Sequence, residues 1–238
     1  MTKLAISGSL CRSYPLNFRS NYGTMIGHGE NVFMDEKVLK LRLIDYLLKK
    51  KYPKCKLIGV EVPFVSMKRR VDVLVITGNM ELIAFEIKSD LDSLRRLNDQ
   101  VKDYKKTFDK LYIVTSAKYK DICSSANIGN SIGCIYINGG IDERKKAKQV
   151  KQLDKHNLAR FLLKDDLTKL GYDKQESVET LRMKLVKEVK PTENVRKLAI
   201  NSLLRRYSKR FELFKKHKEP NTLLSDLDYL TKNFDISL

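Results

Sequence analysis

The sequence contains no tryptophan, only three histidines and only four cysteines among its 238 residues. Without tryptophan or an aromatic-rich strip, nothing singles out base stacking as a way to bind single-stranded nucleic acid. The histidines are too far apart for a local HExxH-type motif, and the cysteines form no CxxC pair. These absences argue against the common local zinc motifs and against a disulfide framework.

Long apolar runs are also absent, because the longest contains four residues, as in VLVI from Val73. A membrane-spanning helix needs about 20 predominantly apolar residues, and the apolar region of a secretory signal needs about 7 to 15. We therefore expect a cytoplasmic protein with no membrane contact.

Acidic side chains are few relative to basic ones: 29 Asp and Glu stand against 47 Lys and Arg, which gives a formal charge of +18. Such an excess favours a polyanionic partner, since Lys and Arg that neutralise phosphates release condensed counterions. Hydrophobic residues make up 42% of the chain, which is enough to bury a core. We expect a folded, basic protein, whose charge reflects either a polyanionic partner such as nucleic acid or a lysine-rich proteome.

The distribution of apolar residues divides the chain into three parts. Residues 1–34 show no sustained period and are expected to be an irregular extension. Residues 35–140 alternate helical and strand patterns, which is typical of an α/β core. Residues 141–238 show only helical patterns, so we expect a helical C-terminal region without strands. The expected strands are 57–64, 71–77, 82–89, 111–115 and 134–138, and the expected helices of the core are 35–51 and 91–108.

Charged side chains interrupt two of these apolar strands. Period-two alternation places Asp72 on one face of its strand, and Glu86 and Lys88 share one face of the next. If the strands are hairpin neighbours, two carboxylates and an ammonium converge. Burying them without partners would be costly, and a Mg²⁺ or Mn²⁺ ion held by Asp72, Glu86 and the Ile87 carbonyl would offset that cost. Lys88 could then orient the attacking water or stabilise phosphate charge.

Asp72 followed by Glu86-Ile87-Lys88 resembles the signature of the PD-(D/E)XK nuclease superfamily, which has the restriction-endonuclease-like fold. Gln100 and Tyr104 match the QxxxY helix motif of the branch that includes RecB-type and phage-type exonucleases. The resemblance implies a mixed central sheet flanked by helices and a metal-dependent nuclease. One departure is Val71, which stands where the superfamily has its name-giving proline.

The resemblance further implies that an acidic residue of the first helix assists the metal, with Glu36 as the candidate and Asp35 as the alternative. Arg96, Gln100 and Tyr104 share one helical face, which suggests that they orient the metal site or a phosphate. Tyr104 could equally be a core aromatic. Glu61 could be a further ligand or an exposed strand residue.

Clusters of basic residues are candidates for contacts with backbone phosphates. On the helix expected at 193–216, an apolar stripe alternates with arginines and lysines, so one face can pack while another meets nucleic acid. The alternative is a helix that only packs or forms a homodimer. The candidate nucleic-acid-binding residues are Lys68, Arg69, Arg70, Arg205, Arg206, Lys209 and Arg210.

The expected function is metal-dependent hydrolysis of phosphodiester bonds, with DNA as the expected substrate. Asp72, Glu86, Lys88 and Gln100 would be the catalytic residues, and Mg²⁺ or Mn²⁺ the cofactor. The sequence does not choose between exonuclease and endonuclease. The alternatives are an RNA nuclease and a non-catalytic nucleic-acid-binding protein that retains the fold.

Overall fold

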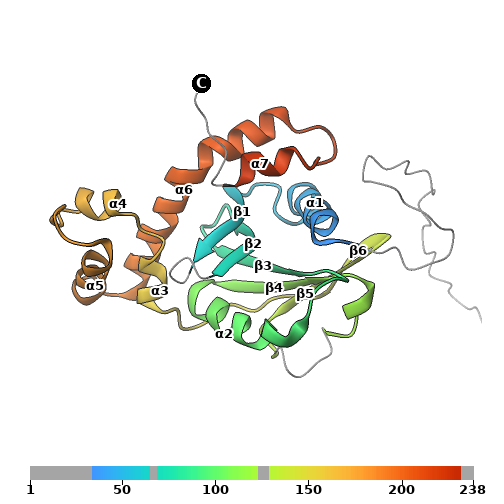
Figure 1. The fold of residues 1–238 in the computed structure, drawn as a ribbon, viewed down its shortest axis with the longest axis horizontal. Helices are drawn as coiled ribbons and strands as arrows, with labels where there is room; N and C mark the ends of the chain where they lie inside the picture. The colour runs from blue at the N-terminus through green and yellow to red at the C-terminus, as the bar shows by residue number, and fades with distance from the viewer. Residues whose placement is uncertain (1–33, 65–68, 123–128, 232–238) are drawn as a thin grey trace, which may run out of the picture.

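The computed structural model of the chain describes residues 34–64, 69–122 and 129–231 (Figure 1). Its centre is one sheet of six strands in the order β1-β2-β3-β4-β5-β6, with helices around it. The strands are β1 Leu57–Phe64, β2 Arg69–Ile76, β3 Leu82–Lys88, β4 Lys110–Thr115, β5 Gly133–Asn138 and β6 Gly140–Lys145. The α-helices are α1 Glu36–Tyr46, α2 Leu97–Thr107, α3 Lys155–Ala159, α4 Lys164–Lys169, α5 Val178–Glu188, α6 Thr192–His217 and α7 Asp226–Leu230.

The sheet is mixed, as expected. Strands β1, β2 and β3 form an antiparallel meander, β3 and β5 both pair in parallel with β4, and β6 returns antiparallel to β5. A parallel step requires a crossover rather than a tight turn, and α2 supplies the one between β3 and β4. The expected α/β class, with a mixed sheet flanked by helices and a helical C-terminal part, is confirmed.

Strand β6 corrects one expectation, because the sequence predicts no strand after residue 140. Its six residues alternate between exposed and half-buried positions and are mostly charged. A strand at the edge of a sheet can be this polar, so hydrophobic periodicity does not reveal it. The division of the chain at residue 140 stays a prediction, and the sheet reaches Lys145.

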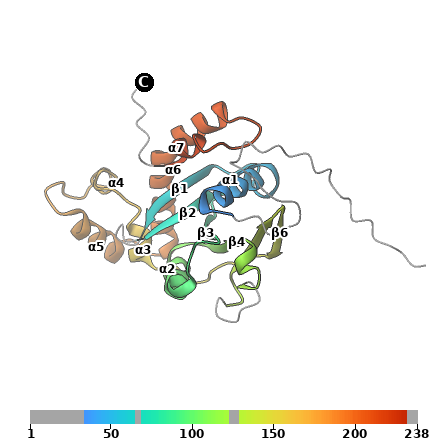
Figure 2. The same ribbon diagram turned by 45° about the vertical axis from the view of Figure 1, so that its right-hand side comes forward.

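Helix α1 begins at the N-cap Asp35, whose side chain accepts a hydrogen bond from the Val38 backbone N–H at 2.8 Å. Its last turn continues as a π-helix, Leu47–Lys51. Figures 1 and 2 show α1 on one side of the sheet and α2 on the other. The sequence predicts an irregular extension over residues 1–34, and residues 1–33 of it lie outside the described part of the chain.

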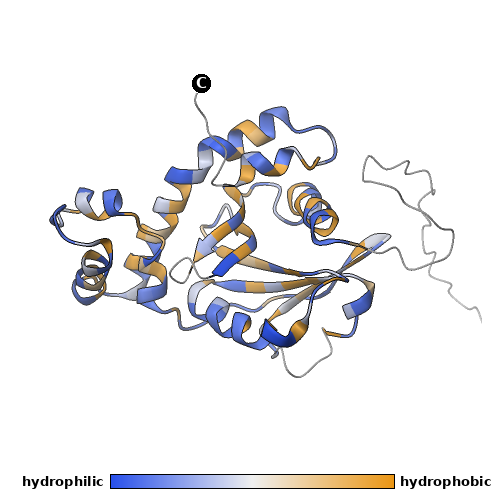
Figure 3. Ribbon diagram, viewed as in Figure 1, coloured by the Kyte–Doolittle hydropathy of each residue, from blue (hydrophilic) through white to orange (hydrophobic). Residues whose placement is uncertain are grey.

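The C-terminal helices pack onto the sheet through α6, which contacts β1, α3 and α7. In Figure 3, hydrophobic and hydrophilic bands alternate along α6, as expected for a helix with one buried stripe. Arg196, near the start of α6, forms an ion pair at 2.6 Å with the buried Asp109, the residue that precedes β4.

Within the described residues, no helix combines the length and the apolar character needed to cross a membrane.

Candidate metal centre

The candidate site lies where the regular pairing of β2 and β3 ends. The last backbone pair is Val73 with Phe85, so Asp72 and Glu86 occupy the next positions on the two strands. The Asp72 carboxylate accepts a hydrogen bond from the Ile87 N–H at 2.6 Å. The Asp72 side chain therefore joins β2 to β3 beyond the point where their backbone pairing ends. It lies beside the Glu86-Ile87-Lys88 segment.

Glu86 is buried, and three side chains donate hydrogen bonds to its carboxylate. One oxygen accepts from Lys88 Nζ at 2.7 Å and from Gln100 Nε2 at 2.6 Å. The other accepts from the Tyr104 hydroxyl at 2.5 Å. The structure thus brings together Glu86, Lys88 and both members of the QxxxY pair, as the sequence predicts. A ligand role for Glu86 and catalytic roles for Lys88 and Gln100 stay predictions.

Tyr104 combines the two roles that the sequence left open. The residue is 1% exposed, and its ring packs against Phe64 and Phe108, with ring centroids 4.9 and 5.5 Å away. Its hydroxyl donates to Glu86 and also to the Arg70 carbonyl at 3.2 Å. Burial and the negative charge of Glu86 raise the pKa of Tyr104 well above its usual value, so the phenol stays a proton donor.

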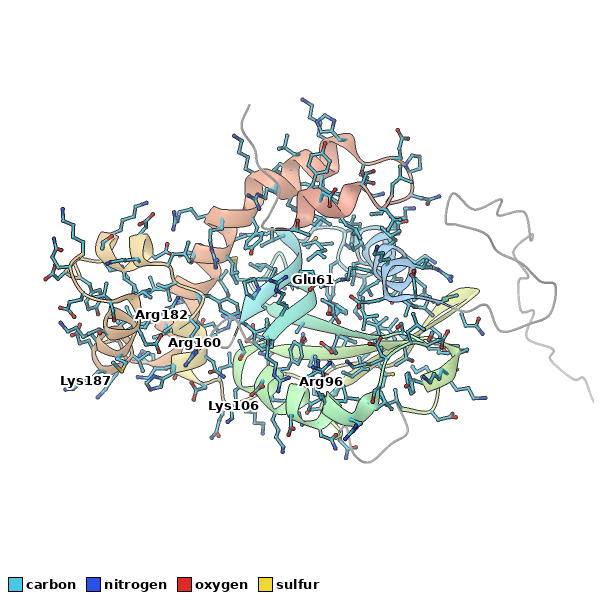
Figure 4. The ribbon with its side chains drawn as sticks, viewed as in Figure 1. Glu61, Arg96, Lys106, Arg160, Arg182 and Lys187 are labelled. Atoms are coloured by element: carbon cyan, nitrogen blue, oxygen red, sulfur yellow. The ribbon has the colours of Figure 1, made fainter. Side chains whose placement is uncertain are left out.

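Two further carboxylates, those of Glu36 and Glu61, form a cluster with Asp72. Glu36 at the start of α1, Glu61 in β1 and Asp72 each offer an oxygen within 4.8 Å of the others. Glu61, labelled in Figure 4, lies between the pairs Val60–Val73 and Val62–Val71 and therefore opposite Asp72. Its φ is +51°, in the left-handed region that non-glycine residues rarely adopt. Such strain is frequent at functional sites.

Lys40 is a member of the site that the sequence analysis missed. Its ammonium donates to Glu36 at 2.8 Å and to Glu61 at 2.5 Å, although the residue is only 5% exposed. Burial lowers the pKa of Lys40, but the hydrogen bonds and charges of these two carboxylates outweigh that effect and raise it. The i, i+4 spacing of Glu36 and Lys40 on an expected helix was the signal that could have identified it.

The charges of the site do not balance. Burial first, and then the charge of Glu86, raise the pKa of Asp72 well above its usual value, although Lys40 and the Ile87 N–H oppose this. Four carboxyl groups face two ammonium groups here, so full ionisation leaves an excess of two negative charges. That excess equals the charge of one divalent cation, and carboxylate oxygens are the ligands that Mg²⁺ and Mn²⁺ prefer. The oxygens of Glu36, Glu61 and Asp72 lie close enough together to share such an ion, whereas Glu86 is not part of that group.

Two other expected residues stand apart from the metal ligands. Asp35, the alternative to Glu36, caps α1 with its side chain. Arg96 is exposed at the N-cap of α2, where Figure 4 labels it. The involvement of the Ile87 carbonyl in metal binding stays a prediction, because the observed contact to Asp72 uses the Ile87 N–H.

Most of the candidate nucleic-acid-binding arginines also hold the fold together. Arg69 pairs with Asp103 at 2.5 Å, and Arg205 pairs with Asp166 at 2.5 Å. Arg206 donates to the Phe161 carbonyl at 2.8 Å, and Arg210 donates to the Thr231 carbonyl at 2.6 Å. Arg70 and Lys209 are exposed, whereas Lys68 lies outside the described residues. Contact of these residues with nucleic acid stays a prediction.

A family profile described as "Bacteriophage P4 protein cII" matches residues 30–231. The chain is also similar to protein cII of Enterobacteria phage P4, with 31% identity over 140 residues. That similarity covers 57% of this chain and 52% of the relative, so the chain spans about half the length of the curated relative it matches. Among solved structures, a protein of unknown function from Silicibacter pomeroyi is similar over 40% of this chain and 62% of its own, at 18% identity and a TM-score of 0.32.

Proposed function

This chain belongs to the family of bacteriophage P4 protein cII, and for it we propose metal-dependent hydrolysis of phosphodiester bonds in nucleic acid, with DNA as the substrate. The observation that carries the proposal is the charge excess at the end of the β2–β3 pairing, where Asp72, Glu86, Lys88 and Gln100 gather in the pattern of PD-(D/E)XK nucleases. A structural ion-pair network needs no such excess.

Each side chain of the site has a role that follows from its chemistry. Asp72 and Glu86, with the Ile87 carbonyl, would hold the cation, and Glu36 and Glu61 offer further oxygens. A bound Mg²⁺ or Mn²⁺ ion would supply a lowered pKa for a coordinated water and charge stabilisation for the phosphate. Lys88 orients the attacking water or stabilises the developing phosphate charge.

Two residues of α2, Gln100 and Tyr104, hold the Glu86 side chain in place. The Gln100 amide and the Tyr104 hydroxyl each donate to it, so the carboxylate keeps one orientation. The Lys88 ammonium donates to the same carboxylate, so one charged and two neutral donors hold it. This arrangement also explains why the two residues lie four apart on one face of α2.

The formal charge of +18 supports a nucleic-acid substrate, because hydrolysis of a phosphodiester requires the enzyme to bind a polyanion. The test is incubation with supercoiled, linear and single-stranded DNA and with RNA, each in Mg²⁺, Mn²⁺ or EDTA. Cleavage of the supercoiled circle would show an endonuclease, and degradation of linear DNA alone would show an exonuclease.

Glu86→Gln and Asp72→Asn should reduce cleavage by at least about a hundredfold, since each removes a charge that the cation needs, while nucleic-acid binding persists. The matched control is Asp99→Asn, which changes an exposed carboxylate of α2 paired with Lys102 on the surface. Cleavage of RNA alone would support the RNA nuclease. Binding without cleavage under every condition would support the non-catalytic protein and overturn the proposal.

A further inference from the structure

Leu91, in the loop between β3 and α2, is the most exposed large hydrophobic side chain of the described residues, at 72%. Single exposed apolar side chains are common on soluble proteins and have no meaning by themselves. Three features of its surroundings set Leu91 apart. Its loop is fixed by hydrogen bonds, the loop lies beside the candidate metal centre, and exposed cations accompany it.

Asp90 holds the loop in place on one side of Leu91. One oxygen of its carboxylate accepts a hydrogen bond from the Ser116 hydroxyl at 2.6 Å, and the other accepts from the Met34 N–H at 3.0 Å. The Asp90 N–H in turn donates to the Met34 carbonyl at 3.3 Å. Met34 lies two residues before Glu36, a member of the acidic cluster. Asp90 therefore holds the loop against the start of α1.

Asp92 fixes the loop on the other side of Leu91. Its carboxylate accepts hydrogen bonds from both the backbone N–H and the hydroxyl of Ser89, at 2.8 and 2.6 Å. The Asp92 carbonyl accepts from the Tyr119 hydroxyl at 2.5 Å. The Leu91 N–H donates to the Ser89 hydroxyl at 3.3 Å. Because the backbone is anchored before and after Leu91, the loop presents this side chain to solvent at a fixed place.

That place is the edge of the candidate metal centre. Leu91 follows Lys88 by three residues, so the Cα atoms of the two residues are at most about 11 Å apart. Successive nucleotides of one strand rise by about 3.4 Å along the helix axis. A nucleic acid whose phosphate lies at the metal centre therefore has a base step within reach of Leu91, about three steps away or nearer.

Exposed cations lie close to Leu91. Arg95 and Arg96 follow it in the turn that leads into α2, and both are exposed; Figure 4 labels Arg96. Lys118 is also exposed, and its ammonium donates to the Asp90 carbonyl at 2.8 Å. An apolar side chain among cations matches the chemistry of a nucleic acid, which offers phosphates to the cations and stacked bases to the apolar group.

We propose that Leu91 inserts between stacked bases of the nucleic-acid substrate as an apolar wedge beside the candidate metal centre, while Arg95, Arg96 and Lys118 contact the flanking phosphates. The inference rests on the proposed function, to which it adds how the substrate is held. Apolar side chains that enter a base step unstack it partially and bend the duplex. Burial of the leucine between bases offsets the cost of unstacking. The fixed loop helps, because little conformational entropy is lost on insertion.

The test is the fluorescence of a short DNA duplex in which 2-aminopurine replaces adenine, a base whose fluorescence rises when its stacking is broken. The measurement is made in EDTA at saturating protein, so that cleavage does not enter. We expect the wild type to raise the fluorescence. Leu91→Ala should lose most of this rise and bind about tenfold more weakly, yet unfold at the same temperature as the wild type, since the side chain is exposed.

Two variants serve as controls. Leu91→Met keeps a long apolar side chain at the same position and should retain the fluorescence rise. Met183→Ala shortens another exposed apolar side chain, on α5, and should bind and raise the fluorescence as the wild type does.

The fluorescence rise at saturation decides the outcome. A folded Leu91→Ala variant that raises the fluorescence as the wild type does would overturn the wedge, even if it binds more weakly, because Leu91 would then be only a surface contact. A wild type that produces no rise would also overturn it. Loss of the rise in Leu91→Ala, together with no cleavage in any cation, would leave the wedge standing while the proposed function fails. Cleavage with the same rise in both proteins gives the opposite result.

Discussion

The ammonium group of Lys40 lies between the carboxylates of Glu36 and Glu61 and is almost excluded from water. Without it, these carboxylates and Asp72 would repel one another across less than 5 Å, a distance at which like charges interact strongly even when partly solvated. Lys40 therefore stabilises the acidic cluster when no divalent cation is bound.

Replacing Lys40 by methionine keeps an unbranched side chain, shorter by one atom, and removes its charge. In EDTA we expect the free energy of unfolding to fall by about 1 to 2 kcal/mol, a modest value because both partners are partly exposed to solvent. Mg²⁺ should restore more stability to this variant than it adds to the wild type, which urea unfolding measures directly. The control is Lys37→Met, an exposed lysine of the same helix, and an equal response of both variants to Mg²⁺ would contradict the expectation.

Asp72 gives the site a pH dependence whose sign follows from its raised pKa. The folded protein binds a proton at Asp72 that the unfolded chain releases near its usual pKa of 3.8. Protonated Asp72 thus favours folding at low pH. This contribution to the free energy of unfolding is lost as the pH rises from the pKa of Asp72 in the unfolded chain through its higher pKa in the folded protein. At neutral pH without metal, the buried carboxylate destabilises the fold.

Asp72→Asn removes that penalty. We expect the variant to be more stable than the wild type in EDTA at neutral pH, and the two to become equal at acidic pH. Thermal unfolding measured across the pH range tests this expectation, with Asp99→Asn as the control on an exposed carboxylate. A constant difference between variant and wild type at every pH would show that Asp72 does not titrate as described.

Among the elements, the hairpin of β5 and β6 gives a comparison between two glycines. A Cβ atom on Gly133 would come within 2.3 Å of the Tyr112 ring and 2.7 Å of the Ala147 nitrogen. A Cβ atom on Gly140 would meet nothing within 4 Å. The same substitution therefore has different consequences at the two positions of this hairpin.

We expect Gly133→Ala to lower the free energy of unfolding by about 1 to 3 kcal/mol, because close packing against a backbone nitrogen cannot relax without moving the chain. Gly140→Ala should change it by less than about 0.5 kcal/mol. Chemical denaturation of both variants measures the difference. Equal stabilities would mean that the segment after β6 moves freely away from β5.

The strands and the site differ in how far the sequence predicts them. Five strands were identified within about two residues at each end, because apolar residues such as Val73 and Ile83 recur with the period of a buried strand. Strand β6 was missed because charged edge strands carry no such period. The shared face of Glu86 and Lys88 followed from strand periodicity, whereas Gln100 was predicted from the resemblance to the QxxxY motif. The left-handed backbone of Glu61 depends on its surroundings, and no local pattern encodes it.

At the scale of the whole molecule, one ion pair joins the helical part to the sheet. Arg196 of α6 donates to both oxygens of the buried Asp109 and to the Met80 carbonyl. Asp109 in turn accepts from the Leu82 N–H at the start of β3. A buried carboxylate that loses its cation is strongly destabilising, whereas a surface pair contributes little.

Arg196→Met should therefore lower the free energy of unfolding by about 2 to 4 kcal/mol. Lys215→Met, which breaks a surface pair with Glu212 on the same helix, should cost less than about 0.5 kcal/mol. Guanidinium unfolding of the two variants compares them, and the contrast tests whether Arg196 anchors the helical part. Similar losses in the two variants would remove that role from Arg196.

The contact of α6 and α7 with β1 has a consequence for how the protein is made. Strand β1 belongs to the first part of the described chain, whereas the helices that pack on it are synthesised after the whole sheet. A nascent chain that ends near Lys190 can already pair its strands, yet it lacks the apolar side chains of Leu203 and Phe211 that are buried in the finished fold. Until α6 and α7 have left the ribosome, this surface is open to chaperones and to other nascent chains, so the core closes only after both helices have been made.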